Sequence, residues 1–209
     1  MITIPHPDVV FTDLGLAILS AWLGWRLWQS STPMRTAGAI ILWGLAVGAL
    51  AGAVFHGFFP DGTRTRGGYL VWMPVPFSIL VVATTLIDLS LRNLLPAIPV
   101  TLRRGIDLVY ALAFAAVVIL VDESFRMIVR FYAPALGLFL LTAVMMAARL
   151  RSRPWTLLAV SFGLSGVAAV LQQAKLGIDP NYFDHNAVYH VLQGVAVALL
   201  YRGFSRMEG

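Results

Sequence analysis

Seven apolar runs take up almost the whole chain, and they restrict its fold more than any other feature of the sequence. A helix needs about 20 apolar residues to cross a membrane, and each run is long enough to do so. We therefore predict an all-α integral membrane protein, a bundle of seven transmembrane helices. The predicted spans lie near residues 10–28, 37–58, 69–90, 103–121, 125–148, 155–177 and 185–203.

Composition excludes a soluble alternative. Hydrophobic residues make up 59% of the 209 residues and charged residues only 12%, which is more apolar surface than a soluble domain of this size can bury. The connections between the runs are at most about 15 residues long, so we expect one domain over residues 1–209. Cysteine is absent, which excludes disulfides, thiolate metal ligands and a cysteine nucleophile.

The charged residues predict an orientation. If the runs alternate in direction, ten of the 15 Lys and Arg residues fall on one side of the membrane, and the positive-inside rule places the N-terminus outside and the C-terminus in the cytoplasm. No basic residue precedes the first run, so we expect it to remain and not to be cleaved as a signal peptide. The basic charge is then a topology signal, and no nucleic-acid partner is expected. We expect a multi-pass protein of a plasma membrane of the bacterial inner-membrane kind.

Residues that could take part in catalysis or ligand binding are concentrated on the outer side. Seven of the ten acidic residues map there, and so do all four histidines, His6, His56, His185 and His190. In the second span, Gly44, Gly48, Gly52 and His56 are spaced four apart and form one stripe on a helix. Such a stripe marks close packing against a neighbouring helix, so His56 is expected to point into the bundle. The alternative is a packing stripe that ends in a hydrogen-bonding histidine.

Asp13 lies on a small-residue face of the first span, which indicates that its carboxylate points inward. A carboxylate at this depth is costly unless it is paired or solvated, and it therefore suggests a functional site. The alternative is that Asp13 caps the start of the helix. In the last span, His185 and His190 are five apart, so both reach one ion only if His185 precedes the first regular turn. The alternative is that Asn186, and not His185, faces the predicted site together with His190.

Three imidazoles and a carboxylate at one depth are the ingredients of a catalytic zinc site, because three neutral nitrogen ligands leave a fourth position for water. Asp13 or Asp61 would then move the proton. Arg126 or Arg130 would hold the polar end of a lipid-like or small amphiphilic substrate from the membrane. The alternative for these arginines is an ion-pair ladder with Asp122 at the interface.

These features resemble the CREST superfamily of seven-helix membrane hydrolases, which includes alkaline ceramidases and the adiponectin/progestin receptor group. The shared features are an outward N-terminus, a histidine near the end of span two and a histidine pair at the start of span seven. The resemblance implies zinc held by His56, His185 and His190, and cleavage of an amide or ester bond of a lipid.

The chain departs from this family pattern at three positions. Gly52 stands where the family has serine, Gly67 stands where it has aspartate, with Asp61 the nearest carboxylate, and Asn186 stands where it has the first histidine of the last pair. Two other functions therefore stay open. One is a non-catalytic membrane subunit or receptor with a ligand pocket and a protein partner in the membrane, and the other is a haem held by His56 and His190.

Overall fold

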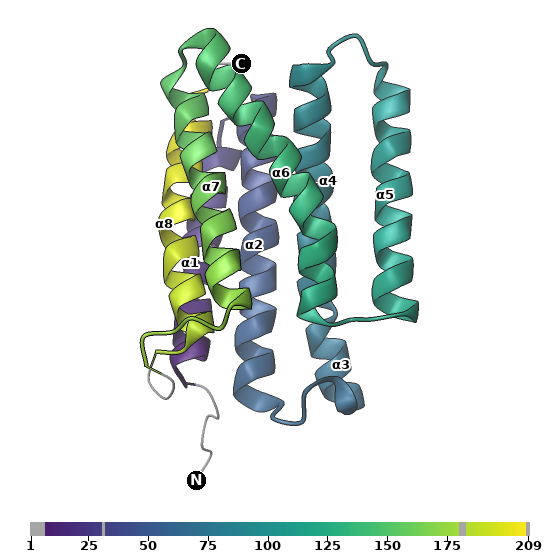
Figure 1. The fold of residues 1–209 in the computed structure, drawn as a ribbon, viewed down its shortest axis with the longest axis vertical. Helices are drawn as coiled ribbons and strands as arrows, with labels where there is room; N and C mark the ends of the chain where they lie inside the picture. The colour runs from purple at the N-terminus through teal and green to yellow at the C-terminus, as the bar shows by residue number, and fades with distance from the viewer. Residues whose placement is uncertain (1–6, 31, 180–182, 208–209) are drawn as a thin grey trace.

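The computed structural model describes residues 7–30, 32–179 and 183–207, and within them seven long helices run back and forth between two ends of a bundle (Figure 1). Two shorter helices, η1 (Gly62–Arg64) and α3 (Arg66–Trp72), connect the second long helix to the third. The long helices are α1 (Pro7–Trp28), α2 (Pro33–Phe58), α4 (Pro74–Leu94), α5 (Val100–Leu120), α6 (Phe125–Leu150), α7 (Arg153–Gln173) and α8 (His185–Ser205).

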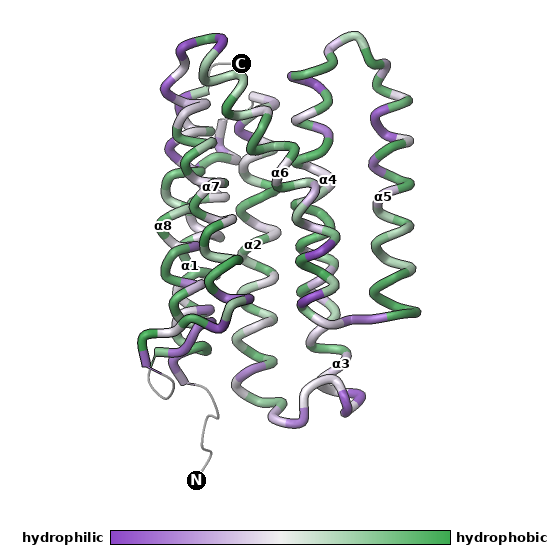
Figure 2. Tube along the Cα trace, in the orientation of Figure 1, coloured by the Kyte–Doolittle hydropathy of each residue, from purple (hydrophilic) through white to green (hydrophobic). Residues whose placement is uncertain are grey.

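The prediction of an all-α bundle of membrane type is confirmed. Six segments are long and apolar enough to cross a membrane, and they comprise α1, α2, α3 together with α4, α6, α7 and α8. Helix α5 is not among the six, since Arg103, Arg104 and Asp107 lie near its start. Figure 2 shows apolar helix bodies with hydrophilic positions concentrated toward the helix ends. This is the architecture of a multi-pass membrane protein.

Local sequence explains where the helices begin. Pro33 occupies the first turn of α2, where its missing N–H costs nothing, and the hydroxyl of Thr32 accepts a hydrogen bond from the Arg35 N–H. Asp184 caps α8 by accepting from the backbone N–H groups of Asn186 and Ala187 at 2.8 and 3.0 Å. These caps fix the rotational phase of each helix from its first residue.

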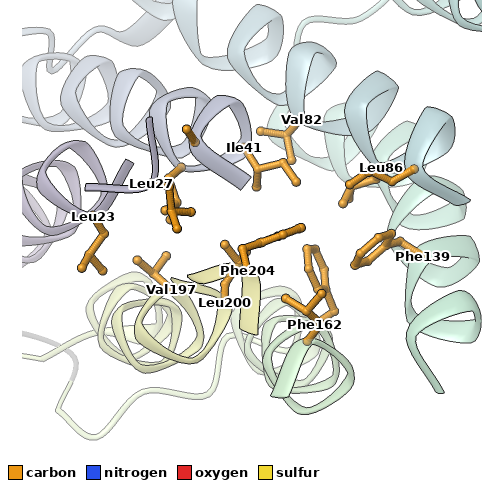
Figure 3. Packing of buried hydrophobic residues seen from close by; sticks show 14 of the residues in the cluster. Leu23, Leu27, Ile41, Val82, Leu86, Phe139, Phe162, Val197, Leu200 and Phe204 are labelled. Carbon is orange, nitrogen blue, oxygen red and sulfur yellow. The ribbon is translucent and has the colours of Figure 1, made fainter. Parts of the chain in front are cut away.

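The main core joins α1, α2, α4, α6, α7 and α8 (Figure 3). Phe139, Phe162 and Phe204 are nearly fully buried in it, together with leucine and valine side chains from the facing helices. The hydrophobic effect does not drive helices together in lipid. Close packing of side chains therefore stabilises a membrane bundle. Helix α5 stands at the edge beyond α4 and buries only Phe114 and Val118 (Figure 1).

The two ends of the bundle differ in charge. We call the end where α1 and α8 begin the acidic end, and the end where they finish the basic end. The basic end carries Arg26, Arg35, Arg92, Arg103, Arg104, Arg149, Arg151, Arg153, Arg202 and Arg206. The described histidines, His56, His185 and His190, lie at the acidic end. His6 lies outside the described residues.

Candidate functional site

A cavity of about 230 Å³ lies at the acidic end, among α1, α2, α3, α4, α6, α7 and α8. We call it the outer cavity. Its polar lining comes from α1, α7, α8 and the end of α2, whereas most of its apolar lining comes from α2, α3, α4 and α6. The polar residues are Asp13, His56, Gln172, Asn186, Tyr189 and His190, and the apolar ones are Leu16, Leu45, Ala49, Phe55, Trp72, Val75, Ile79 and Phe125.

Asp13 and His190 form a close pair on the polar side of this cavity. Oδ1 of Asp13 lies 3.1 Å from Nε2 of His190, and their side chains are only 5% and 11% exposed. The alternative that Asp13 caps α1 is wrong, because α1 begins at Pro7, six residues earlier. The carboxyl group therefore lies beside the buried His190 ring, at the distance of an ion pair when that ring is protonated.

Thr12 fixes the other side of the His190 ring. Its hydroxyl lies 2.8 Å from the carbonyl oxygen of Asp8 and 3.1 Å from Nδ1 of His190. The hydroxyl accepts from Nδ1–H in one ring tautomer and donates to an unprotonated Nδ1 in the other. Thr12 and Asp13 therefore each lie against one ring nitrogen of His190.

The glycine stripe of α2 has two roles. A Cβ atom at Gly48 would lie 2.7 Å from the hydroxyl oxygen of Ser78, so this glycine lets α2 approach α4. A Cβ atom at Gly52 would lie 2.9 Å from Oδ2 of Asp13, so this glycine leaves room for the carboxylate. The stripe thus both packs a helix and shapes the outer cavity.

Asn186, and not His185, lines the outer cavity together with His190. The two residues are four apart on α8 and share a face. Oδ1 of Asn186 accepts from the Gln172 side-chain amide at 3.1 Å, and its own amide donates to Asp184 at 3.2 Å. Nδ1 of His185 lies 3.8 Å from a carboxylate oxygen of Asp184.

The remaining predicted residues do not line the outer cavity. Asp61 is exposed in the connection after α2, and Arg126 and Arg130 are exposed on α6. Asp122 accepts a hydrogen bond from the backbone N–H of Ser124 at 2.8 Å. Hydrogen bonds from Ser124 hold the pKa of Asp122 below its usual range.

A zinc site of the predicted kind needs three protein ligands around one ion. Within the part of the chain that the structure describes, no group of three His, Cys, Asp or Glu side chains is placed to hold an ion. Both ring nitrogens of His190 have partners in Thr12 and Asp13. This donor set does not fit the predicted three-histidine site, and zinc stays a prediction that metal analysis tests.

A comparison with protein families shows to which family the chain belongs. The family model described as "Family of unknown function (DUF6962)" matches residues 9–209. The chain belongs to this family. No curated protein and no solved structure matches it. The match contains every residue that lines the outer cavity of this DUF6962 protein.

Sequence reasoning missed three polar residues at the outer cavity of the DUF6962 protein. Thr12 bonds the His190 ring, Tyr189 lines the cavity, and Gln172 bonds Asn186. The available signal for Tyr189 was its place beside His190 on the first turns of α8. Gln172 lies in the last turn of α7, and the packing of α7 on α8 brings it to Asn186.

Proposed function

We propose that the outer cavity binds an amphiphilic molecule from the membrane, such as a lipid or lipid-like compound. The observation that carries this proposal is the division of the lining into polar residues around Asp13 and His190 and apolar residues such as Phe55, Trp72 and Ile79. Pockets of this kind take the apolar body of a ligand and orient it with a few polar groups. The polar group of the ligand lies toward Asp13 and His190.

We further infer that all seven long helices cross the membrane, with the acidic end outside. Helix α5 has 21 residues, enough for about 31 Å at 1.5 Å per residue. The gathering of ten of the 15 basic residues at the opposite end supports a cytoplasmic basic end. The outer cavity then opens toward the outer leaflet.

A fatty acid with bromine atoms on its acyl chain tests the binding proposal, because bromine quenches a nearby indole. Trp72 lines the outer cavity, so the probe is expected to quench part of the tryptophan emission of the detergent-purified chain. Trp72→Phe should remove that saturable part, and Ala49→Phe should prevent it by filling the cavity. Quenching that is unchanged in both variants contradicts the proposal.

Hydrolysis of an ester or amide bond in the bound molecule is a second candidate. The Asp13 and His190 pair favours it, because a carboxyl group and an imidazole 3.1 Å apart are placed to pass one proton between them. In this reaction water adds to the carbonyl carbon, the pair takes the proton of that water, and the same proton passes to the leaving oxygen or nitrogen. The resemblance to membrane hydrolases points to the same bond types.

The two candidates differ in their products. A panel of lipid esters and amides is incubated with the purified chain and analysed by mass spectrometry, with Asp13→Asn as the comparison. Product formed by the wild type and lost in Asp13→Asn supports hydrolysis, whereas binding without product leaves the binding proposal alone. A haem between His56 and His190 is not proposed, because both nitrogens of the His190 ring already have partners.

A further inference from the structure

A second hollow lies at the opposite end of the bundle. A groove of about 960 Å³ separates α5 from α2 and α4 near the basic end. We call it the basic groove. Ile40, Leu108 and Ala111 give it an apolar part. The amphiphile proposed above occupies the acidic end, so the basic groove requires an explanation of its own.

Charged side chains of α4 and α5 surround the basic groove. Asp88 is paired with Arg92 at 2.6 Å and with Arg103 at 3.0 Å. Arg104 lines the same groove and is exposed. The lining contains three arginines and two aspartates, a formal net charge of +1, so one singly charged anion neutralises it.

Asp107 adds a second requirement. It lines the basic groove, and within the described residues its Oδ1 atom is buried without a hydrogen-bond partner. A buried acceptor of this kind costs free energy until the side chain turns toward a donor. A fitting occupant therefore carries both a negative charge and a hydrogen-bond donor, with an apolar part for Leu108 and Ala111.

We propose that the basic groove binds one anionic phospholipid of the phosphatidylglycerol type. Its phosphate lies at Arg104, a headgroup hydroxyl donates to Asp107, and an acyl chain follows Leu108 and Ala111 between α5 and the bundle. The positive end of a membrane protein attracts anionic lipids of the facing leaflet, and arginine pairs well with a phosphate. This site is independent of the outer cavity and of the reaction proposed for it.

Native mass spectrometry of the full chain in detergent, with equal amounts of phosphatidylglycerol and phosphatidylcholine, tests the site. The wild type is expected to retain one phosphatidylglycerol in preference to phosphatidylcholine. Arg104→Gln should lower this preference on the order of five-fold. The matched control is Arg149→Gln at the same end of the bundle, which lies outside the groove and should leave the preference unchanged.

Two further variants separate the headgroup from the acyl chain. Asp107→Ala should abolish any preference for phosphatidylglycerol over phosphatidic acid, which lacks the glycerol hydroxyls. Ala111→Phe should fill the groove and lower retention, whereas Leu112→Phe on the exposed face of α5 should not. Circular dichroism checks that each variant keeps its helices. In the case that Ala111→Phe does not fold, Arg104→Gln by itself tests the lipid site.

Three results would overturn the proposal. The first is equal retention of both lipids by the wild type. The second is an equal loss of preference in Arg104→Gln and Arg149→Gln. The third is a dimer that covers α5 and retains no lipid, because the groove would then be an interface between two copies of the chain.

Discussion

Gly52 leaves the space that the carboxylate of Asp13 occupies. A Cβ atom at position 52 would lie 2.9 Å from Oδ2 of Asp13, closer than such atoms normally approach. The other oxygen of the same carboxylate lies 3.1 Å from Nε2 of His190. The glycine stripe of α2 therefore ends not only in a histidine but also beside a buried acid, and the geometry of the pair depends on a missing side chain.

Gly52→Ala should displace the Asp13 carboxylate and lengthen its 3.1 Å contact with Nε2 of His190. Adding a methyl group to a close-packed site typically costs about 1–3 kcal/mol, and we expect a loss of this size in the free energy of unfolding. Denaturant titration in detergent micelles measures it. Binding of the brominated fatty acid should weaken in the same variant.

The matched control is Gly15→Ala on α1, where a Cβ atom would meet nothing within 4 Å. Alanine is favoured over glycine inside a helix by about 1 kcal/mol, so this variant should be as stable as the wild type or more so. A loss of stability equal to that of Gly52→Ala would contradict the role assigned to Gly52.

Asp13 and His190 should behave as one unit. Asp13→Ala or His190→Ala alone leaves a buried polar group without its partner, which costs about 1–3 kcal/mol. The double variant should cost less than the two single changes added together, by about 0.5–3 kcal/mol of coupling. Unfolding free energies of the four proteins in one detergent give this coupling. Additive losses would mean that the two side chains do not interact.

The sequence predicted the helices well because a membrane span is a property of a continuous stretch. The seven runs correspond to the seven long helices, although α4 is separated from α3 at Met73, just before Pro74. Proline lacks the N–H that would continue the helix. Helix α5 is the exception in composition. The charged residues at its start exclude it from the six segments that are apolar enough to cross a membrane.

The candidate site could be predicted only in part. Asp13, His56 and His190 were expected at one depth, and they line one cavity. The choice between His185 and Asn186 depended on the phase of the first turn of α8, which the Asp184 cap sets. Sequence spacing does not contain that phase, and it also does not contain the contact between Gly52 and Asp13 on different helices.

Thr12→Val should remove the hydrogen bond at Nδ1 of His190. Valine keeps the shape of threonine but lacks the hydroxyl, so a buried ring nitrogen loses its partner at a cost of about 1–3 kcal/mol. Nitrogen NMR of ¹⁵N-histidine should show the His190 signals change, with His190→Gln used for assignment. The control is Thr142→Val, whose buried hydroxyl donates to the Leu138 carbonyl of its own helix.

Asn186→His should add a third imidazole to the outer cavity. The new side chain would line the cavity with His56 and His190, and a zinc ion that displaces Asp13 from Nε2 of His190 would then have three nitrogen ligands. We expect the purified wild type to hold much less than one zinc per chain and Asn186→His to hold close to one. Elemental analysis after dialysis measures both. A full equivalent of zinc in the wild type would restore the original zinc prediction.

Single cysteines test the crossing of α5, because the natural chain contains none. Ala97 lies in the connection before α5, and Ser124 lies in the connection after it. If α5 spans the membrane with the acidic end outside, a membrane-impermeant maleimide should label Ser124→Cys on intact cells. It should label Ala97→Cys only after the cells are opened. Thr65→Cys, at the acidic end before α3, is the reference for the outer side and should label like Ser124→Cys. Labelling of both Ala97→Cys and Ser124→Cys from one side would mean that α5 does not cross, and the positive charge at its start would then lie at the membrane surface.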